Sequence, residues 1–600
     1  MKRSALLLSI MFGCQRSAPS SSPEPVTVPS LCATRSALTP LGDSASSSSV
    51  ALGRLGERRV ALLADEDDQV LRLIDLEAEA IVASVPLGGA PGHVLIDPHG
   101  RVHVSLPELD RVVELTATSK GLTECARTET PPEPRALAVF KDALLVATRG
   151  GLTMLGPTPG TIALSRDPEG ILVTGSDALI AHRVGSIVSV VSLDRRVVSR
   201  EVSLAWRDRV SVSGIPVADM PRFAVQAHGL ARVGERVMVP MVLAYPGDMH
   251  VDVTFPSGYG AASVQGVDGY FPHEAAVSSF QEAGEKPRVQ LARETLEERA
   301  QRVSRGRTAP KQPPCLLPRS VAAHHDELVV TCLGIDRLLV YRGDSDLEHA
   351  ERARIELPSG PVALAVDGDD AVVWSQFARA VSVVSLTNQT KRSFAIAPDT
   401  ARDVAFIEGR KTFHAPLAFD GRACASCHPD GGDDGLVWAT PHGPLQPPTL
   451  AGRLDAAPFG WLGGAPTLEA HIGETMKRLM AKPMHKDTMD PLVAYLRAMK
   501  PRSRRPLAAL EKRGRELFVS TEVGCASCHE HGGADGVRHD VGTGGTFDTP
   551  SLASLATSGP YMHDGRFATL REAIALDTMG STKHLSDDDL TALVAYLKTL

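Results

Sequence analysis

Two short stretches of the chain combine residue types that can do redox chemistry. Each has two cysteines separated by two residues and followed at once by a histidine, and the six residues are Cys424, Cys427, His428, Cys525, Cys528 and His529. Thiols at this spacing can bond both vinyl groups of one porphyrin, while the histidine ligates the iron from the proximal side. A zinc site fits poorly, because no further cysteine pair lies within zinc-finger distance. The spacing therefore predicts two covalently bound haem c groups, with His428 and His529 as proximal ligands.

The sequence around these stretches occurs twice. The matching segments are 409–413 with 514–518, 431–435 with 532–536, 448–450 with 550–552, and 492–496 with 593–597. In each copy we expect a first helix at the Gly-Arg-x-x-Phe phrase to cross a last helix at the Leu-Val-Ala-Tyr-Leu phrase, beside the haem edge. This arrangement predicts two tandem, all-α cytochrome c class I folds, over residues 399–500 and 501–600.

Longer phrases in this region resemble a known family. Phe-Asp-Thr-Pro-Ser-Leu at 547–552 and Gly-Pro-Tyr-Met-His-Asp-Gly-Arg at 559–566 resemble the bacterial di-haem cytochrome c peroxidase and MauG superfamily, and residues 459–464 match it more loosely. The resemblance implies electron transfer with peroxidase or MauG-like oxidase activity. Hydrogen peroxide or another oxidant would then react at the first haem, and a small cytochrome or cupredoxin would deliver electrons through the second.

The same resemblance implies a distal ligand in the second half. Met579 stands where the family places its distal methionine. A thioether opposite a histidine raises the reduction potential and gives an electron-transfer haem. Met562, His563 and His584 are nearby alternatives, and a methionine that only fills space in the core is the simpler interpretation.

Four residues of the first half receive roles from the resemblance. His442 resembles the family's displaceable distal histidine, and Met476 is its rival for the iron. If Met476 ligates, both haems are closed and the peroxidase interpretation weakens. Glu474 is the expected acid–base group for peroxide cleavage. Trp461 is expected either between the haems as an electron carrier or as a core aromatic beside a porphyrin.

Three further polar residues are candidates near the haems. His539 is expected to contact a haem propionate or to line the second site. Asp433 and Asp434 lie in a glycine-rich loop, which either binds Ca²⁺ or is simply solvated.

Residues 50–398 carry a repeated phrase: a small residue or proline, an apolar run, a polar turn and a second apolar run. The phrase begins at residues 50, 91, 134, 168, 227, 318 and 361. Third and fourth apolar runs follow several copies, and four short strands per unit of roughly 40 residues are typical of a β-propeller blade. Asp75, Pro91, Asp97 and Gly100 resemble the YVTN or surface-layer type of propeller. We expect an N-terminal, all-β propeller of seven blades, and closure with a borrowed strand would change that count by one.

The interval between the fifth and sixth phrases is about twice a normal blade, which predicts an insertion over about residues 243–315. The insertion either caps the propeller or reaches the haem region or a partner. The propeller strands show no clustered His/Asp/Glu set at metal-ligand spacing, so a lactonase-like activity centred on the propeller is the weakest hypothesis. Cys315 and Cys332 are expected to form a disulfide, and Cys32 and Cys125 can also oxidise in an exported chain.

The first residues predict export. Lys2 and Arg3 precede an apolar run at 5–12 that is too short to span a membrane. The run ends near Cys14 in a sequence that resembles a bacterial lipobox. This implies residues 1–14 as a lipoprotein-type signal, acylation of Cys14, and a place in the periplasm or cell envelope; an ordinary cleaved signal peptide is the alternative. Residues 15–49 are rich in serine and proline and predict a flexible tether.

Composition limits the remaining possibilities. The chain has 600 residues, of which 43% are hydrophobic and 22% charged, so it is an ordinary globular chain with several domains. Its net charge of −8, with no long basic run, argues against nucleic-acid binding and mildly favours a basic protein partner. The main alternative to an enzyme is an electron carrier with both haems closed and with the propeller as a module for binding a ligand or partner.

Overall fold

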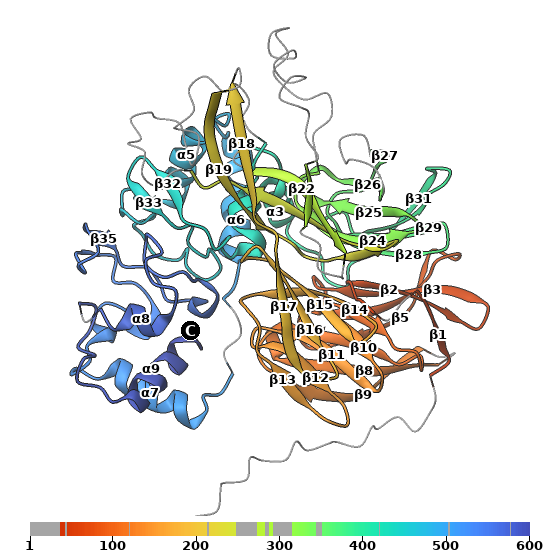
Figure 1. Ribbon diagram of the computed structural model, residues 1–600, viewed down its shortest axis with the longest axis horizontal. Coiled ribbons are helices and arrows are strands. Elements are labelled where there is room, and N and C mark those ends of the chain that lie inside the picture. Colours follow the sequence, from red (N-terminus) through yellow and green to blue (C-terminus); the bar gives the residue numbers. More distant parts are fainter. Residues whose placement is uncertain are drawn as a thin grey trace, which may run out of the picture.

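The computed structural model shows a ring of β-sheets beside a helical region (Figure 1). It describes residues 36–42, 45–118, 121–212, 215–247, 273–281, 287–291, 315–343, 351–418, 421–501, 505–576 and 578–600. The expected signal segment, Cys14, Cys32 and most of the expected tether and insertion lie outside the described residues. None of the helices in the described ranges has the length and apolarity needed to cross a membrane.

The ring consists of seven antiparallel sheets, each built from consecutive strands, so the expected seven-bladed propeller is confirmed. The strands of the first three blades are β1 (Leu38–Leu41), β2 (Val50–Leu55), β3 (Arg58–Asp65), β4 (Val70–Asp75) and β5 (Ala80–Pro86); β6 (Val94–Ile96), β7 (Val102–Leu106), β8 (Arg111–Thr118) and β9 (Gly121–Glu129); and β10 (Leu137–Phe140), β11 (Ala143–Thr148), β12 (Gly151–Leu155) and β13 (Gly160–Ile162).

The other four blades complete the ring. Their strands are β14 (Pro168–Thr174), β15 (Asp177–His182), β16 (Ile187–Ser192) and β17 (Val197–Ser203); β18 (Trp206–Val212), β19 (Ile215–Val225), β20 (Ala231–Val233), β21 (Arg236–Ala244), β22 (His273–Gln281) and β23 (Arg288–Leu291); β24 (Pro318–His324), β25 (Glu327–Cys332), β26 (Arg337–Arg342) and β27 (Glu351–Glu356); and β28 (Pro361–Asp367), β29 (Asp370–Ser375), β30 (Ala380–Ser385) and β31 (Lys391–Ala395). Strand β2 of the first blade packs against β28 of the seventh, which closes the ring.

Position within a blade decides how apolar a strand is. Strand β4 is buried along its whole length, whereas the outer strand β5 has no buried residue. An inner strand is covered on both faces by neighbouring blades, so it can be continuously apolar, while an outer strand borders solvent. Apolar side chains of neighbouring blades fill the space between the sheets, as Leu62 and Leu73 do with Val94 and Val104.

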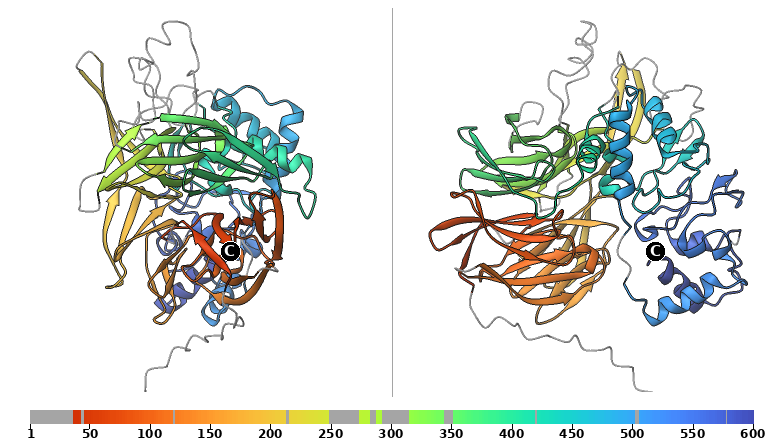
Figure 2. Two further views of the ribbon diagram at one scale, coloured as in Figure 1. Left: turned by 90° about the vertical axis from the view of Figure 1, so that its right-hand side faces the viewer. Right: turned by 180° about the vertical axis from the view of Figure 1, so that it is seen from behind.

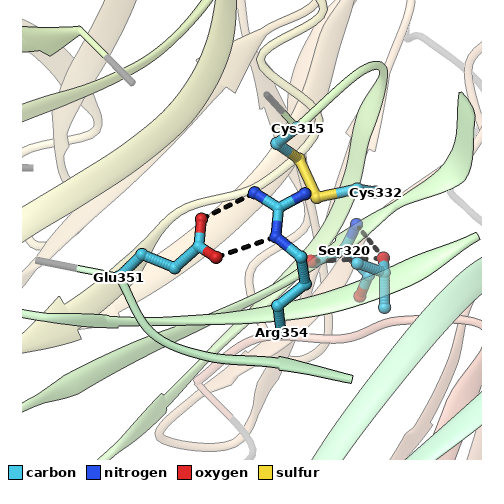
Figure 3. Close-up of a disulfide and its surroundings, with 6 residues drawn as sticks. Cys315, Ser320, Cys332, Glu351 and Arg354 are labelled. Carbon is cyan, nitrogen blue, oxygen red and sulfur yellow. Dashed lines mark hydrogen bonds and ion pairs between the residues drawn. A yellow bond between two sulfur atoms is a disulfide. The ribbon is translucent and has the colours of Figure 1, made fainter. Parts of the chain in front are cut away.

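The expected disulfide between Cys315 and Cys332 is confirmed, with an S–S distance of 2.01 Å (Figure 3). It joins the segment that enters the sixth blade to the end of β25. Close by, Arg354 donates to both carboxylate oxygens of Glu351, at 2.8 and 2.7 Å. The bridge fixes the chain where it returns to the propeller after the long insertion.

The helical region contains two similar units. The first has α3 (Val404–His414), α4 (Cys424–Cys427), α5 (Leu468–Arg478) and α6 (Lys486–Ala498), and the second has α7 (Ala509–Val519), α8 (Leu570–Ile574) and α9 (Asp587–Leu597). The first and last helices of each unit cross as expected, α3 on α6 and α7 on α9. Glycines allow the crossing, because a Cβ on Gly409 would lie 2.0 Å from the carbonyl oxygen of Pro491, and one on Gly514 would lie 1.9 Å from that of Ala592.

This contact predicts a large effect from a single methyl group. Gly514→Ala should lower the free energy of unfolding of the second unit by about 2 kcal/mol or more, because the helices must separate to admit the Cβ. Gly473→Ala in α5 is the matched control: nothing lies within 4 Å of its Cβ position, so removing a helical glycine should stabilise by up to about 1 kcal/mol. Urea denaturation followed by far-ultraviolet circular dichroism measures both, and equal effects would contradict the proposed helix contact.

The two helical units lie beside one face of the propeller in Figure 1 and in the right-hand view of Figure 2. That face carries the β3–β4 turn, the β15–β16 turn, the segment before β14 and the start of β24, all of which contact the helical region. Arg410 of α3 forms two ion-pair contacts with Asp67 in the β3–β4 turn, both 2.9 Å long. The propeller and the first helical unit are therefore joined by specific buried contacts.

Candidate functional site

The two attachment turns have the same local geometry. The first turn is α4, followed by His428, and the second is the 3₁₀ turn Cys525–Ser527, followed by Cys528 and His529. The backbone N–H of each histidine donates to the carbonyl of the first cysteine, at 3.0 Å for His428 and 3.1 Å for His529. A single turn therefore brings both cysteines and the histidine together in each unit.

Each histidine is also oriented by its own chain. Nδ1 of His428 lies 3.3 Å from the carbonyl oxygen of Gly432, and Nδ1 of His529 lies 3.2 Å from that of Gly533. A carbonyl only accepts, so Nδ1 carries the proton and the Nε2 lone pair is left to bind iron. Burial lowers the pKa of His428 to about 4 and also lowers that of His529, which keeps both imidazoles neutral. Two thiols and a neutral, pre-oriented imidazole fit haem c at both turns.

Aromatic side chains form a contact between the two helical units. Trp461 of the first unit lies 6.2 Å from the ring of His563 in the second, edge to face, and the His563 ring stacks on Phe547 at 3.7 Å. Trp461 donates to the carbonyl of Gln446 at 2.7 Å, and the Gln446 backbone N–H donates to the carbonyl of His563 at 2.7 Å. Trp461 thus lies at the junction of the two helical units, and its role as an electron carrier between the haems stays a prediction.

The first turn is covered by the propeller. Gln226 donates through Nε2 to the carbonyls of Ala425, at 3.1 Å, and Ser426, at 3.0 Å. Just beyond the turn, Arg319 donates to Asp430 at 3.0 Å. The first attachment turn is therefore built on residues contributed by the propeller.

The expectation that Asp433 and Asp434 lie in a solvated loop is wrong. Their side chains are buried, at 1% and 0% exposure. Asp433 accepts from Arg166 at 2.8 Å, from Thr449 at 3.0 Å and from the backbone of Gly435. Asp434 accepts from the indole N–H of Trp438 and the backbone of Leu436, both at 2.9 Å. Because protein donors already use these oxygens, the pair does not fit a Ca²⁺ site.

The candidate distal residues of the first unit lie in different environments. Met476 is buried in the apolar cluster that Cys424 borders, whereas Glu474 on the same helix is exposed. His442 is exposed at the tip of a hairpin formed by β32 (Trp438–Thr440) and β33 (Gly443–Leu445). The described contacts do not bring His442 to the turn, so its role as a ligand stays a prediction.

The candidates of the second unit are spread around its turn. Nε2 of His539 lies 2.8 Å from Asp535 and 3.9 Å from Sγ of Cys528, so this histidine lines the second site. His584 pairs with Glu522 at 3.2 Å. Met579 and Met562 are half-buried, and which of them ligates stays a prediction.

Two residues near the first turn escaped sequence reasoning. His471 of α5 is close enough for its charge to add to the effect of burial in lowering the pKa of His428. Gln226 approaches the turn from about 200 positions earlier in the chain. Neither residue belongs to a recognisable motif. The sequence around Gln226 does not indicate its role, because folding alone brings Gln226 and the first turn together.

Two described segments of the long insertion contact the first helical unit. The backbone N–H of Ala439 donates to the carbonyl of Pro246 at 2.8 Å, and His273 stacks on Trp438 with 5.1 Å between ring centroids. Pro246 follows β21 and His273 opens β22. These contacts favour the interpretation in which the insertion serves the haem region, although residues 248–272 lie outside the described part of the chain.

Comparison with known proteins agrees with this geometry. Residues 511–600 match the cytochrome c family, so the C-terminal part of the chain is a cytochrome c domain. The chain is accordingly a haem c-binding, electron-transfer protein of oxidoreductase type that also carries a seven-bladed propeller.

Particular relatives resemble part of the chain. Hydrazine synthase subunit gamma of Kuenenia stuttgartiensis is 25% identical over 256 residues, covering 30% of this chain and 72% of that protein. Methylamine utilization protein MauG of Methylorubrum extorquens is 26% identical over 255 residues, again covering 30% and 72%. Among solved structures, Kuenenia stuttgartiensis hydrazine synthase covers 64% of this chain and 100% of its own, at 11% identity and a TM-score of 0.37.

Proposed function

We propose that this protein is an exported di-haem cytochrome c that reduces hydrogen peroxide or a related oxidant with electrons from a small redox protein. One observation carries the proposal: two attachment turns of the same geometry lie in two units that meet at Trp461 and His563. The reaction consumes one peroxide, two electrons and two protons and releases two waters. A small cytochrome or cupredoxin supplies the electrons one at a time.

Bound haem c supplies one-electron redox chemistry at each site. The chain's own residues hold and serve it: Cys424 and Cys427 with His428 in the first unit, and Cys525 and Cys528 with His529 in the second. Trp461 lies where the units meet, so its indole provides a route of aromatic contact between them.

Helix α5 provides the acid–base groups of the proposal. His471 lies near His428, and the Glu474 carboxylate is close enough to oppose the effect of burial on the pKa of His471. The two side chains are three positions apart, so they lie on the same helix face. We propose that Glu474, which is exposed, exchanges protons with solvent and that His471 relays them to the first site.

Glu474→Gln tests this role. It should lower kcat/KM for peroxide by about 10²-fold or more, because the amide cannot exchange a proton. Glu469→Gln, on the same helix, removes a similar charge without removing the proposed group and should leave kcat/KM within about twofold. Steady-state peroxide consumption with a reduced donor cytochrome measures both, and equal losses in the two variants would remove Glu474 from the mechanism.

Electron paramagnetic resonance tests the proposed function itself. The oxidised protein is measured first, and again after the addition of one electron per molecule. A high-spin ferric signal in either sample is the expected result, since peroxide needs an open iron position. Low-spin ferric signals alone in both samples, weaker after the added electron because reduced haem gives no signal, would instead support a closed electron carrier. The structural argument for that carrier is Met476, which is buried in the apolar cluster that Cys424 borders.

We also propose that the chain is exported and anchored in the cell envelope by acylation of Cys14. Covalent attachment of haem c and the Cys315–Cys332 disulfide both suit an oxidising, extracytoplasmic compartment. The Cys14→Ala variant should move from the membrane fraction to the soluble fraction of the cell envelope. Retention of this variant on membranes would argue against a lipid anchor.

A further inference from the structure

The two attachment turns have the same sequence but different surroundings. In the first turn Ala425 and Ser426 are 3% and 1% exposed. In the second turn none of the residues Cys525–Ser527 is buried, and Ser527 is exposed. The difference comes from the propeller, which covers the first turn.

Gln226 makes two hydrogen bonds from the propeller to the first turn. Its side chain is 1% exposed, and its amide nitrogen donates to the two successive carbonyls of Ala425 and Ser426. Hydrogen bonds to groups beside a haem ligand tune the metal and hold its attachment in place. The second turn faces outward at the corresponding residues.

The backbone of Gln226 is strained. Its φ of 60° lies in the left-handed region, which costs a residue with a side chain roughly 1–2 kcal/mol. Its backbone N–H donates to the carbonyl of Arg183 at 2.7 Å, which holds this conformation. A strained, buried residue whose amide donates to the cofactor-binding turn suggests a functional constraint.

Charged residues of the propeller also form ion pairs with the loop that follows the first turn. Arg183 and Arg319, from two blades, approach Asp430 to 3.7 and 3.0 Å, and Arg166 lies 2.8 Å from Asp433. All three arginines come from the propeller, and all three carboxylate contacts lie on the loop that follows His428. Arg183 also donates to Asp167 at 3.1 Å, so three carboxylates face the three arginines and the junction can exclude water without leaving one of these charges unpaired.

We propose that the propeller is a permanent part of the first haem site and that Gln226 is the positioning residue through which it acts. Gln226 fixes the first attachment turn, and its amide N–H groups offset the partial negative charge on the carbonyl oxygens of Ala425 and Ser426. The propeller thereby gives the two haems different reduction potentials, although their attachment motifs are alike. The inference rests on the proposed function only in requiring two bound haems.

The test is the reduction potential of each haem in the full-length, haem-loaded protein, measured by spectroelectrochemical titration. Gln226→Gly removes the amide and also relieves the strained backbone, so it should fold. Without the amide, the bare carbonyls and entering water both favour the oxidised, more positive state. One of the two potentials should therefore become more negative while the other stays unchanged, and hydrogen exchange at residues 424–428 should become faster.

Gln389→Gly is the matched control. Gln389 also has a positive φ, of 57°, but it is exposed in a turn of the seventh blade. This variant should change neither potential. Gln226→Asn is the second variant: asparagine tolerates the same backbone but is one methylene shorter, so it should reproduce the shift in one potential.

Unchanged potentials in folded Gln226→Gly and Gln226→Asn proteins, or equal shifts at both haems, would overturn the proposal. The proposed function fails separately, through absent peroxide reduction in the unaltered protein. Even then, comparing the two haem reduction potentials of the unaltered protein with those of the Gln226 variants still tests whether Gln226 positions the first turn.

Discussion

Replacing Cys424 and Cys427 by serine should leave one covalently bound haem per chain where the unaltered protein has two. Serine has no thiol to add to a vinyl group, so the first turn loses both of its bonds to porphyrin. The Cys525→Ser and Cys528→Ser double variant should lose the other haem and keep the first. Absorbance of the pyridine haemochrome per chain, together with the mass of the denatured protein, measures the number of bound haems.

The two double variants should differ in a second way. The first turn packs between the propeller and the core of the first unit, so losing its haem should also weaken the junction around Gln226 and Asp430. The second turn faces outward, and its loss should leave the propeller contacts intact. Limited proteolysis between residues 398 and 424 reports this difference. A single haem in the unaltered protein would contradict the di-haem assignment directly.

Replacing Arg410 by alanine should lower the free energy of unfolding by about 2–3 kcal/mol, because the buried Asp67 loses its two closest ion-pair contacts and keeps the longer one to Arg402, at 3.4 Å. Both side chains are nearly inaccessible, at 7% and 6% exposure, and both contacts are 2.9 Å long. The Arg410 guanidinium also lies 4.6 Å from the centre of the Phe377 ring in the seventh blade. The pair therefore joins the first helix of the haem region to two blades of the propeller.

Arg515→Ala is the matched control, since Arg515 occupies the same position of the Gly-Arg-x-x-Phe phrase in the second unit but is exposed. Its loss should change stability by less than about 0.5 kcal/mol. The Asp67→Ala and Arg410→Ala double variant should cost less than the sum of the two single changes, because both remove the same pair. Equal costs for Arg410→Ala and Arg515→Ala in urea denaturation would show that the junction contributes nothing through this ion pair.

Local patterns in the sequence determined the architecture and the attachment chemistry. All seven repeat phrases correspond to blades of the propeller, because alternating turns and apolar runs specify strands through neighbours only a few residues away. The Gly-Arg-x-x-Phe and Leu-Val-Ala-Tyr-Leu phrases correctly predicted the crossing helices, since the glycine and the apolar face are both local features. The disulfide between Cys315 and Cys332 could also be predicted, because its two cysteines are only 17 positions apart and flank a single β-hairpin.

Only the tertiary structure decided how the parts act on one another. Asp433 and Asp434 appeared to be loop residues open to solvent, but packing against Arg166 and Trp438 buries them. The contact of Gln226 with the first turn, and that of Trp461 with His563, join segments about 200 and 100 positions apart. Such contacts depend on the summed geometry of many elements and leave no period or motif in the sequence. The identical turns at Cys424 and Cys525 became unequal for the same reason: their sequence fixes the bonds they can make, but the neighbouring domain fixes their exposure to water.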